Sequence, residues 1–384
     1  MRNQGNINFN RKYPQVEDLR IKALHRIPRF AFDYLDGGCN QEENLARNTR
    51  ELQQLMLKPN YLVNYSGAAL QTSLFGETYS APFGVAPMGL QGLMWPGASR
   101  ILAKAAFNHK LPFILSTVAT SPIEEICELT EGKAWFQFYH PASSEVRDDL
   151  IARAEAAGCK VLVLLCDVPT HGYRPREIRN GLSMPPRMSM RNILQMLSRP
   201  QWALATLMEG TPHFANLKPY MPKGLDLRGL GRFMDELFEK RMTADKIAAI
   251  RDRWKGTLVL KGVASEADAA LAVKLGLDGI VISNHGGRQL DIGESSIAAL
   301  QRLAPKYADK LTIMMDSGLR SGTDIARAMA CGAQFTFLGR AFMYGTAALG
   351  KNGGEHTIAM LKAQLKQTME QLGCTSPAAL SAHL

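Results

Sequence analysis

One pattern of apolar and polar residues recurs along most of this chain. A short, often β-branched apolar run ends abruptly in polar residues, and an amphipathic, alanine-rich segment follows it. Such runs are typical of buried strands, and apolar residues three and four positions apart are typical of helices. The eight predicted strands are Phe83–Pro87, Leu111–Ser116, Trp135–Tyr139, Val161–Asp167, Thr257–Lys261, Gly279–Ser283, Leu311–Asp316 and Phe335–Gly339. With helical segments such as Ala267–Leu275 and Asp324–Ala330 between them, they predict an α/β fold, a (β/α)8 TIM barrel, rather than an open doubly wound sheet.

Two further regions lie outside this repeat. Residues 1–16 are polar, and we expect them to be ordered only by contact with the rest of the chain. From Glu17 to Leu35 the apolar residues have helical spacing, broken at Pro28, and residues 73–80 predict an irregular hairpin. We therefore expect a single barrel domain over residues 1–384, with an N-terminal helical and hairpin extension over 1–80 and an insertion over 181–230 after the fourth strand.

The carboxyl ends of the predicted strands carry chemically useful side chains. Catalytic groups of such barrels gather at this end, which here supplies Pro87, Ser116, Gln137, Tyr139, Asp167, Lys261, His285, Asp316, Gly339 and Arg340. His285 and Arg288 follow the sixth strand, and a base beside a permanent cation suits an anionic substrate that must lose a proton. The alternative is a histidine packed at a strand end and an arginine at the surface. Tyr34, near the end of the predicted helix, either reaches this site or belongs to the core.

The loops after the last two strands predict a phosphate site. Asp316-Ser-Gly318-Leu-Arg320-Ser-Gly322 and Leu338-Gly339-Arg340 offer backbone N–H groups at helix starts and two guanidinium groups. Barrels of this kind often bind a phosphate there, through helix N-termini and bidentate arginine.

Composition narrows the possible partners. The net charge of +10 and the pI of about 9.3 favour an acidic partner, but no basic run with interleaved aromatic residues predicts nucleic-acid binding. The six cysteines form no CxxC pair, so we expect free thiols, a reducing compartment and no metal site. No apolar run has the length of a membrane span and no signal peptide is visible, which predicts a cytoplasmic protein or one that touches a membrane from that side.

The region between the fourth and fifth strands is too long for a simple connection, and loops of this length are usually functional. Met188–Met208 is rich in Leu, Met, Ile and Trp, including Trp202, and five Lys or Arg stand between 181 and 224 against only Glu209. These basic residues are Arg187, Arg191, Arg199, Lys218 and Lys223. The pattern is typical of an interfacial membrane segment. A lid over the site and an oligomer contact are the alternatives.

The motif Ser283-Asn-His-Gly-Gly-Arg-Gln-Leu-Asp291 resembles that of the FMN-dependent α-hydroxy acid dehydrogenase and oxidase family, whose members oxidise lactate, glycolate and mandelate. The resemblance covers nearly the whole chain. Its other segments are Phe32–Tyr34, Ala86-Pro87, Leu115–Thr117, Trp135–Tyr139, Asp167 with Gly172–Arg174, Leu260–Gly262 and Asp316–Arg320. It implies FMN as cofactor, oxidation of an (L/S)-2-hydroxy acid to the 2-oxo acid, and a homo-oligomer, a tetramer in this family.

The resemblance also implies a role for each site residue. His285 takes the α-proton or the hydroxyl proton and Asp167 orients its imidazole, while Tyr139 contacts the reacting hydroxyl. Arg174, Arg288 and Tyr34 bind the substrate carboxylate. Lys261 stabilises negative charge on the reduced cofactor. The implied cofactor-binding residues are Pro87, Met88, Gly89, Ser116, Gln137, Lys261, Ser283, Asp316, Gly318, Arg320, Gly339 and Arg340.

Several positions depart from the family pattern. Met88 and Leu165 stand where threonine is usual, which removes one flavin hydrogen bond, and Pro175 stands where an acidic residue is common. Gly89, where the oxidases tend to carry alanine, and the segment after it resemble the mandelate dehydrogenase and membrane lactate dehydrogenase branch. We therefore expect a dehydrogenase that passes electrons to a quinone or another non-oxygen acceptor. The alternatives are an oxidase producing hydrogen peroxide, a non-redox FMN barrel isomerase, and a catalytically silent flavin-binding scaffold.

Overall fold

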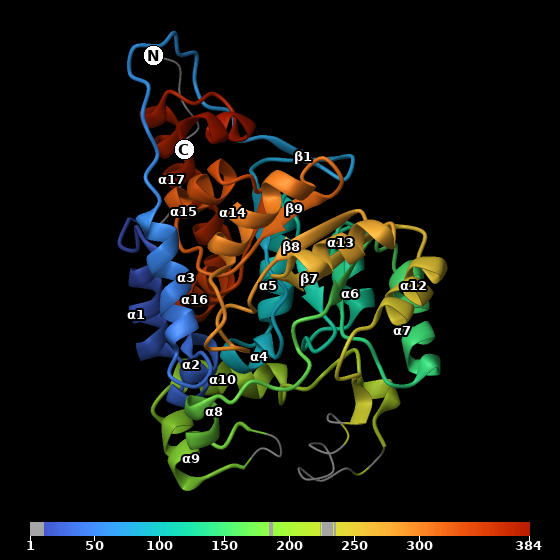
Figure 1. Cartoon of the computed structure of the whole chain (residues 1–384). Coiled ribbons are helices and arrows are strands. Elements are labelled where there is room, and N and C mark those ends of the chain that lie inside the picture. Colours follow the sequence, from blue (N-terminus) through green and yellow to red (C-terminus); the bar gives the residue numbers. More distant parts are fainter. Residues whose placement is uncertain (1–10, 184–186, 223, 225–232, 234–235) are drawn as a thin grey trace.

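Eight parallel strands form the centre of the protein in a computed structural model, which describes residues 11–183, 187–222, 224, 233 and 236–384 (Figure 1). The strands are β3 (Phe83–Val85), β4 (Ile114–Ser116), β5 (Trp135–Phe138), β6 (Val161–Leu165), β7 (Thr257–Val263), β8 (Gly279–Ile282), β9 (Thr312–Met315) and β10 (Phe335–Leu338). Their order in the sheet is β3-β10-β9-β8-β7-β6-β5-β4. A parallel bridge between Val85 and Phe113 joins the two ends of this order, so the sheet is closed.

The predicted (β/α)8 barrel is therefore confirmed, with small shifts at the strand ends. Tyr139 and Asp167 lie just beyond β5 and β6, and β7 continues past Lys261 to Val263. Each strand of the barrel is buried along most of its length because helices cover the outer face and side chains fill the interior. The interior cluster includes Ile114, Trp135, Val163, Val259, Val281, Met314, Phe335 and Phe337.

Helices follow the strands and cover the barrel. They are α4 (Gln91–Met94), α5 (Ala98–Asn108), α6 (Ile123–Leu129), α7 (Ser144–Ala156), α12 (Ala244–Arg253), α13 (Glu266–Lys274), α14 (Ser296–Tyr307), α15 (Gly322–Ala330), α16 (Arg340–Leu349) and α17 (Gly353–Leu372). The short 3-10 helices η2 (Gly350–Asn352) and η3 (Pro377–His383) precede and follow α17. Ser143, Ser265, Ser295 and Ser321 accept a hydrogen bond from the first turn of α7, α13, α14 and α15, which explains why these helices begin where they do.

The helical segment expected over Glu17–Leu35, with its break at Pro28, and the hairpin expected over 73–80 are both present. Helix α1 (Val16–Arg26) ends before Pro28 and α2 (Arg29–Asp36) begins after it, followed by α3 (Glu43–Gln54). The hairpin of β1 (Thr72–Leu74) and β2 (Glu77–Tyr79) closes the amino end of the barrel. There the ring of Phe75 lies 5.7 Å from that of Trp135. Residues 1–10 lie outside the described part of the chain.

The long segment after β6 contains α8 (Pro175–Arg179), α9 (Met190–Leu197), α10 (Pro200–Glu209) and η1 (Lys218–Tyr220). In Figure 1 the helices α8, α9 and α10 lie together at the lower end, opposite the β1–β2 hairpin. Trp202, expected in an interfacial segment, is instead buried: its ring packs 5.8 Å from that of Phe30 and its N–H donates to the Leu93 carbonyl at 3.2 Å. Within the described residues no helix has both the length and the apolar character to cross a membrane.

Candidate active site

A cavity of about 530 Å³ lies at the carboxyl end of the barrel and collects most of the predicted site residues. Ser116, Gln137, Asp167 and Ser283 stand behind its surface. The predicted residues that line it are Tyr34, Pro87, Met88, Gly89, Tyr139, Arg174, Lys261, His285, Arg288, Asp316, Gly318, Arg320, Gly339 and Arg340.

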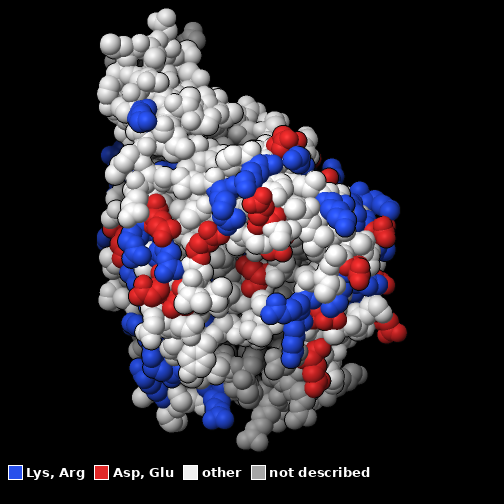
Figure 2. Space-filling model, in the orientation of Figure 1, with Lys and Arg blue, Asp and Glu red and all other residues white. Residues whose placement is uncertain are grey.

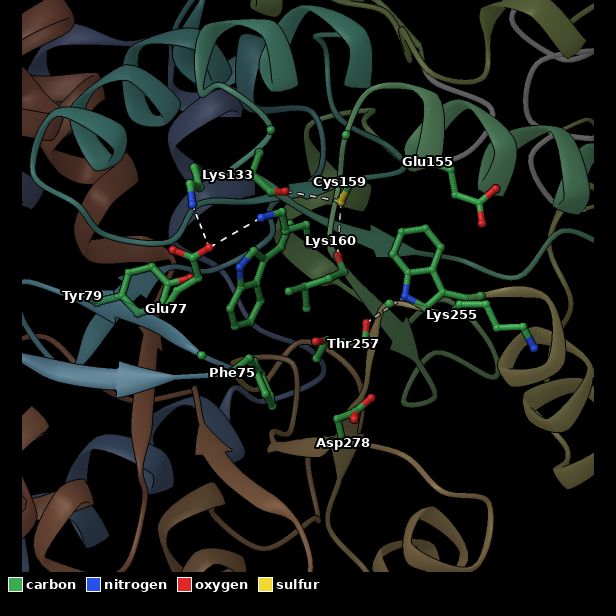
Figure 3. Close-up of a pocket in the computed structure, with 18 of the residues that line it drawn as sticks. Phe75, Glu77, Tyr79, Lys133, Glu155, Cys159, Lys160, Lys255, Thr257 and Asp278 are labelled. Carbon is green, nitrogen blue, oxygen red and sulfur yellow. Dashed lines mark hydrogen bonds and ion pairs between the residues drawn. The ribbon is translucent and has the colours of Figure 1, made fainter.

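A second cavity, of about 740 Å³, lies at the opposite end, around the starts of β5, β6 and β7 (Figure 3). Several of its charged side chains pair with one another. Lys133 and Lys160 both point at Glu77, at 2.7 Å and 3.7 Å, and Arg251 pairs with Asp278 at 3.1 Å. None of the predicted site residues lies there, so we place the chemistry at the carboxyl end.

His285 is held by its own backbone and by Asp167. Its φ of +57° is left-handed, a conformation in which non-glycine residues are uncommon, and its N–H donates to the Ser283 hydroxyl at 3.1 Å. Imidazole Nδ1 lies 3.1 Å from Oδ1 of Asp167. Burial lowers the pKa of His285 although Asp167 opposes this, so the ring is neutral at pH 7. With Nδ1–H donated to the carboxylate, Nε2 carries the lone pair of a general base.

Asp167 is a buried carboxylate whose charged form is stabilised by its neighbours. Burial acts to raise the pKa of this carboxyl, but His285 and Lys261 outweigh it and the net shift is downward. Its second oxygen, Oδ2, is buried and has no hydrogen-bond partner among the described residues. A carboxylate with a spare acceptor next to the imidazole is suited to stabilise imidazolium when the ring takes up a proton.

Lys261 is a buried ammonium at the end of β7. It lies 2.9 Å from Oδ2 of Asp316 and donates to the Ser283 hydroxyl at 3.0 Å. Burial opposes the charge, but Asp316 and Asp167 raise the pKa of Lys261 above its ordinary value, so it stays protonated. This group offers a fixed positive charge in a site largely closed to water.

Two arginines face each other across a carboxylate. Arg288 Nη2 lies 2.7 Å and Arg174 Nη1 3.5 Å from Oε1 of Glu177. The Arg288 guanidinium also stands 5.0 Å above the ring of Tyr34, and it donates to the Tyr34 carbonyl at 2.7 Å. The structure therefore brings together the three residues expected to bind a carboxylate.

The phenol groups of Tyr34 and Tyr139 both line the cavity. Burial raises the pKa of both, so they remain protonated hydrogen-bond donors. The ring of Tyr139 packs 5.2 Å from that of Phe238, which comes from the long segment after β6.

Ser116 and Gln137 form a buried polar pair at the ends of β4 and β5. The Ser116 hydroxyl donates to Gln137 Oε1 at 2.9 Å. The amide nitrogen of Gln137 is buried and has no partner among the described residues. A buried donor left unsatisfied costs about 1–3 kcal/mol, so this position suits a ligand with a carbonyl oxygen or ring nitrogen.

The loops after β9 and β10 expose backbone rather than side chains. Ser317 and Gly318 have φ of +76° and +87°, and a Cβ at Gly318 would meet the Asn48 carbonyl at 2.8 Å. Gly339 immediately precedes α16, and Gly339 and Arg340 both line the cavity, so the unpaired N–H groups at the start of this helix lie beside it.

Arg340 differs from the expectation of a side chain free for phosphate. Its guanidinium donates to the carbonyls of Leu35, Gly286 and Gly37, at 3.0, 2.9 and 2.8 Å. Burial, assisted by Arg320, lowers the pKa of Arg340 to about 9. The side chain therefore fastens α2 to the His285 loop, and Arg320 remains the guanidinium more available to an anion.

Comparison with known proteins agrees with this geometry. Residues 23–384 match the family model described as FMN-dependent dehydrogenase. The chain belongs to this family. It is accordingly an FMN-dependent oxidoreductase that acts on the CH–OH group of 2-hydroxy acids, as the sequence predicted.

Solved structures similar to this chain include both mandelate dehydrogenases and a mandelate oxidase. A monotopic membrane protein, (S)-mandelate dehydrogenase, is 34% identical, with a TM-score of 0.91 over 96% of this chain and 98% of that one. A soluble mutant of the membrane-associated (S)-mandelate dehydrogenase from Pseudomonas putida is 33% identical, with a TM-score of 0.80 over 95% and 97%. Mandelate oxidase is 29% identical, with a TM-score of 0.82 over 96% and 97%.

The residues present fit FMN. The unsatisfied amide of Gln137 suits the polar edge of a flavin ring, Lys261 suits negative charge on it, and the loops at Gly318 and Gly339 suit its phosphate. When bound, FMN accepts the two electrons released by oxidation of the hydroxy acid.

Some residues that shape the site were missed from the sequence. Asn284 donates to Asn44 and Asn48 of α3, at 2.6 and 2.7 Å, and Asp291 accepts from the N–H of Asn44 at 3.0 Å. These contacts fasten the loop that carries His285 to the N-terminal extension. The signal for these contacts in the sequence is the pair of asparagines four positions apart, at Asn44 and Asn48. Glu177, between the two arginines, was missed too.

Proposed function

We propose that this enzyme oxidises an (S)-2-hydroxy acid to the 2-oxo acid and passes the electrons to a quinone or another non-oxygen acceptor. One observation carries the proposal: His285, which Asp167 contacts from behind, lines the same cavity as Arg174 and Arg288. The arginines, with the Tyr34 hydroxyl, bind the carboxylate. This places the α-carbon and its hydroxyl near Tyr139 and Nε2 of His285, which accepts a proton. Asp167 stabilises the imidazolium that results.

The decisive test of the reaction is anaerobic bleaching of the purified yellow protein with a panel of L- and D-2-hydroxy acids. We expect rapid loss of flavin absorbance with one enantiomeric series only, because the carboxylate, the hydroxyl and the α-hydrogen each have a fixed place. An oxidised spectrum that persists with every acid of the panel would refute the proposal.

The cavity wall beside Tyr139 favours a substrate with a bulky apolar side chain. Leu90, Val118, Phe214 and Phe238 meet there, and all four line the cavity. Burying an apolar side chain in such a wall stabilises binding by about 1.5–3 kcal/mol. We expect a phenyl- or branched-chain-substituted acid to show a kcat/KM at least tenfold above that of lactate.

The choice of electron acceptor rests on Gly89. A Cβ at this position would meet Cγ2 of Val118 at 2.8 Å, so the chain packs closely where family oxidases tend to carry alanine. We expect reoxidation by oxygen to be slow relative to a quinone. The alternative, an oxygen-dependent oxidase, is favoured by the similarity to mandelate oxidase. Hydrogen peroxide formed at the rate of turnover would decide for it.

We also propose that α9 and α10 place the enzyme on the inner face of the cytoplasmic membrane. Leu194, Leu197, Leu204 and Leu207 are exposed, the last 81% accessible. Exposed basic residues accompany them: Arg187, Arg191 and Lys218. Apolar burial plus about 1 kcal/mol per basic residue near anionic lipid would hold the protein there. Arg199 is less available, since it donates to the Ile27 carbonyl, and Lys223 lies outside the described residues.

Liposome co-sedimentation tests the membrane contact. Leu204→Ser with Leu207→Ser should release the protein from anionic liposomes and spare reduction of a soluble dye. Ile21→Ser on α1, another exposed apolar position at 49% accessibility, is the control. Native protein that ignores anionic liposomes at low ionic strength would leave the segment as a lid or an oligomer contact.

We propose a homo-oligomer as well. The segment 56–65 exposes Met56, Tyr61, Leu62 and Tyr65, with Leu62 fully accessible. Figure 2 shows acidic and basic residues interspersed over much of this face, while the projecting end at the top is nearly uncharged. Light scattering should give a multiple of 42.3 kDa, and Leu62→Asp should lower it. A native monomer would refute this proposal.

A further inference from the structure

Glu177 is a buried carboxylate in the middle of the site that binds the substrate carboxylate. It lies in α8, one turn after Arg174, and it is 8% exposed. A single oxygen, Oε1, lies 2.7 Å from Arg288 Nη2 and 3.5 Å from Arg174 Nη1. The carboxylate of Glu177 therefore lies at the place where the carboxylate of the substrate is proposed to bind.

Each of the two guanidinium groups uses three of its five N–H donors within the protein. Arg174 gives Nε to the Arg288 carbonyl at 3.2 Å, Nη2 to Gln289 at 3.0 Å and Nη1 to Glu177. Arg288 gives Nη1 to the carbonyls of Tyr34 and Gly37 and Nη2 to Glu177. Only Nε of Arg288 has no partner among the described residues. A carboxylate that binds Arg288 side-on, through Nε and the second N–H of Nη2, would therefore lie next to Glu177 and be repelled by its charge.

The net charge of Arg174, Arg288 and Glu177 also indicates that Glu177 weakens the binding of a substrate carboxylate. Burial, and then the Arg288 charge, lower the pKa of Arg174, which shows that the two cations repel each other in a poorly solvated place. With Glu177 they carry one surplus positive charge, and one substrate carboxylate neutralises it. Without Glu177 the surplus would be two, and every bound monocarboxylate would be attracted more strongly.

We propose that Glu177 is a positioning residue that holds Arg174 and Arg288 side by side and competes with the substrate carboxylate for Arg288. It thereby sets the affinity for carboxylates low enough for the 2-oxo acid to leave. The inference rests on the proposed function, since it takes the two arginines as the carboxylate site. The substrate and the product both carry the carboxylate, so the strength with which Arg174 and Arg288 bind it affects product release as well as substrate binding.

The test uses the FMN-loaded enzyme and titrates oxalate, a non-oxidisable dicarboxylate, by the change in the flavin spectrum. Glu177→Gln keeps an oxygen that accepts from both arginines but removes the charge. We expect the dissociation constant for oxalate to fall about tenfold or more. In turnover kcat should fall because product release becomes slower, and KM should fall by a larger factor because the substrate carboxylate is bound more tightly as well.

Two further variants sharpen the test. Glu177→Asp keeps the charge, so its oxalate affinity should stay within about threefold of the native value. This variant also serves if Glu177→Gln does not fold. Glu294→Gln removes the same charge from an exposed pair with Arg302, away from the two arginines, and should change nothing.

Oxalate affinity that is unchanged or weaker in Glu177→Gln overturns the proposal, because a purely structural carboxylate would give that result. So would a Glu177→Asp variant that binds oxalate tenfold more tightly. Failure of the proposed function is distinguishable. If no hydroxy acid bleaches the flavin but Glu177→Gln still tightens oxalate binding, the role of Glu177 beside the two arginines is supported and the proposed reaction is refuted.

Discussion

Replacing Asp167 by Asn tests the core of the catalytic argument with a minimal change. The side chain keeps its shape and can still accept the Nδ1–H of His285, now 3.1 Å from the carboxylate. What disappears is the negative charge that stabilises the imidazolium when His285 takes a proton. Because Asp167 is behind the cavity surface, the substitution should leave substrate binding almost intact.

The size of the effect follows from the geometry. Two unit charges about 4 Å apart attract each other by about 4 kcal/mol at an effective dielectric constant of 20, and each 1.36 kcal/mol is tenfold in rate. Lys261 and Arg174 both disfavour imidazolium, and within the described part of the chain Asp167 is the group that favours it. Allowing for partial proton transfer in the transition state, we expect the rate of flavin reduction to fall about 10²–10³-fold.

Stopped-flow absorbance under anaerobic conditions measures this rate directly, and its pH dependence checks the sign. His285 must be neutral to act as a base, so the rate is lost as the pH falls through its pKa, which burial sets below 6.5. Asp167 raises that pKa, so in Asp167→Asn the loss must move to lower pH. A fall of less than fivefold with full FMN content, or a midpoint that moves to higher pH, would refute the assignment of Asp167.

Three other outcomes follow from the same contacts. His285→Gln should retain FMN and lower anaerobic flavin reduction by about 10²–10⁴-fold, and a variant near the native rate would mean that another group is the base. Gln137→Leu, which removes the unsatisfied buried amide, should weaken FMN binding measurably in equilibrium dialysis, while unchanged affinity would place the flavin elsewhere. Asp36→Asn should destabilise the fold by about 2–4 kcal/mol in denaturant unfolding, because Asp36 joins Arg20, Arg176 and Tyr344. Burial acts to raise the pKa of Asp36, but these partners lower it below its ordinary value. The charged carboxylate therefore stabilises the native protein above the unfolded-state pKa of about 3.9, and this stabilisation is lost as the pH falls below that value. In Asp36→Asn this part of the pH dependence should be absent.

The barrel could be predicted from the sequence because its signals are local. Each strand is a short apolar run with a polar end, and the closed order of strands follows from alternation with helices. The same locality gave the residues at the strand ends, such as Lys261 and His285, since a barrel brings its carboxyl ends together whatever the loops do.

Side-chain direction could not be predicted in the same way. Trp202 counts as an apolar residue of an amphipathic segment, but only the position of Phe30, far away in the chain, shows that it is buried. Arg340 belongs to a phosphate-type loop, but its guanidinium is taken by carbonyls from α2 and the His285 loop. A motif fixes where a backbone turns, and the partner of a long side chain depends on segments hundreds of positions away.

The acids of the site show what this limit means for function. The sequence pointed to the basic groups, yet His285, Lys261 and Arg288 each contact a carboxylate from another segment. Lys261 and Asp316 neutralise each other, and the two arginines with Glu177 keep one positive charge, which is what a monocarboxylate substrate needs. Asp167 beside a neutral His285 keeps one negative charge, which is what an arriving proton needs. In the proposed reaction the substrate carboxylate would meet the surplus positive charge of the arginines, and the proton taken up by His285 would meet the negative charge of Asp167. Neither charge would then be left unbalanced inside the site.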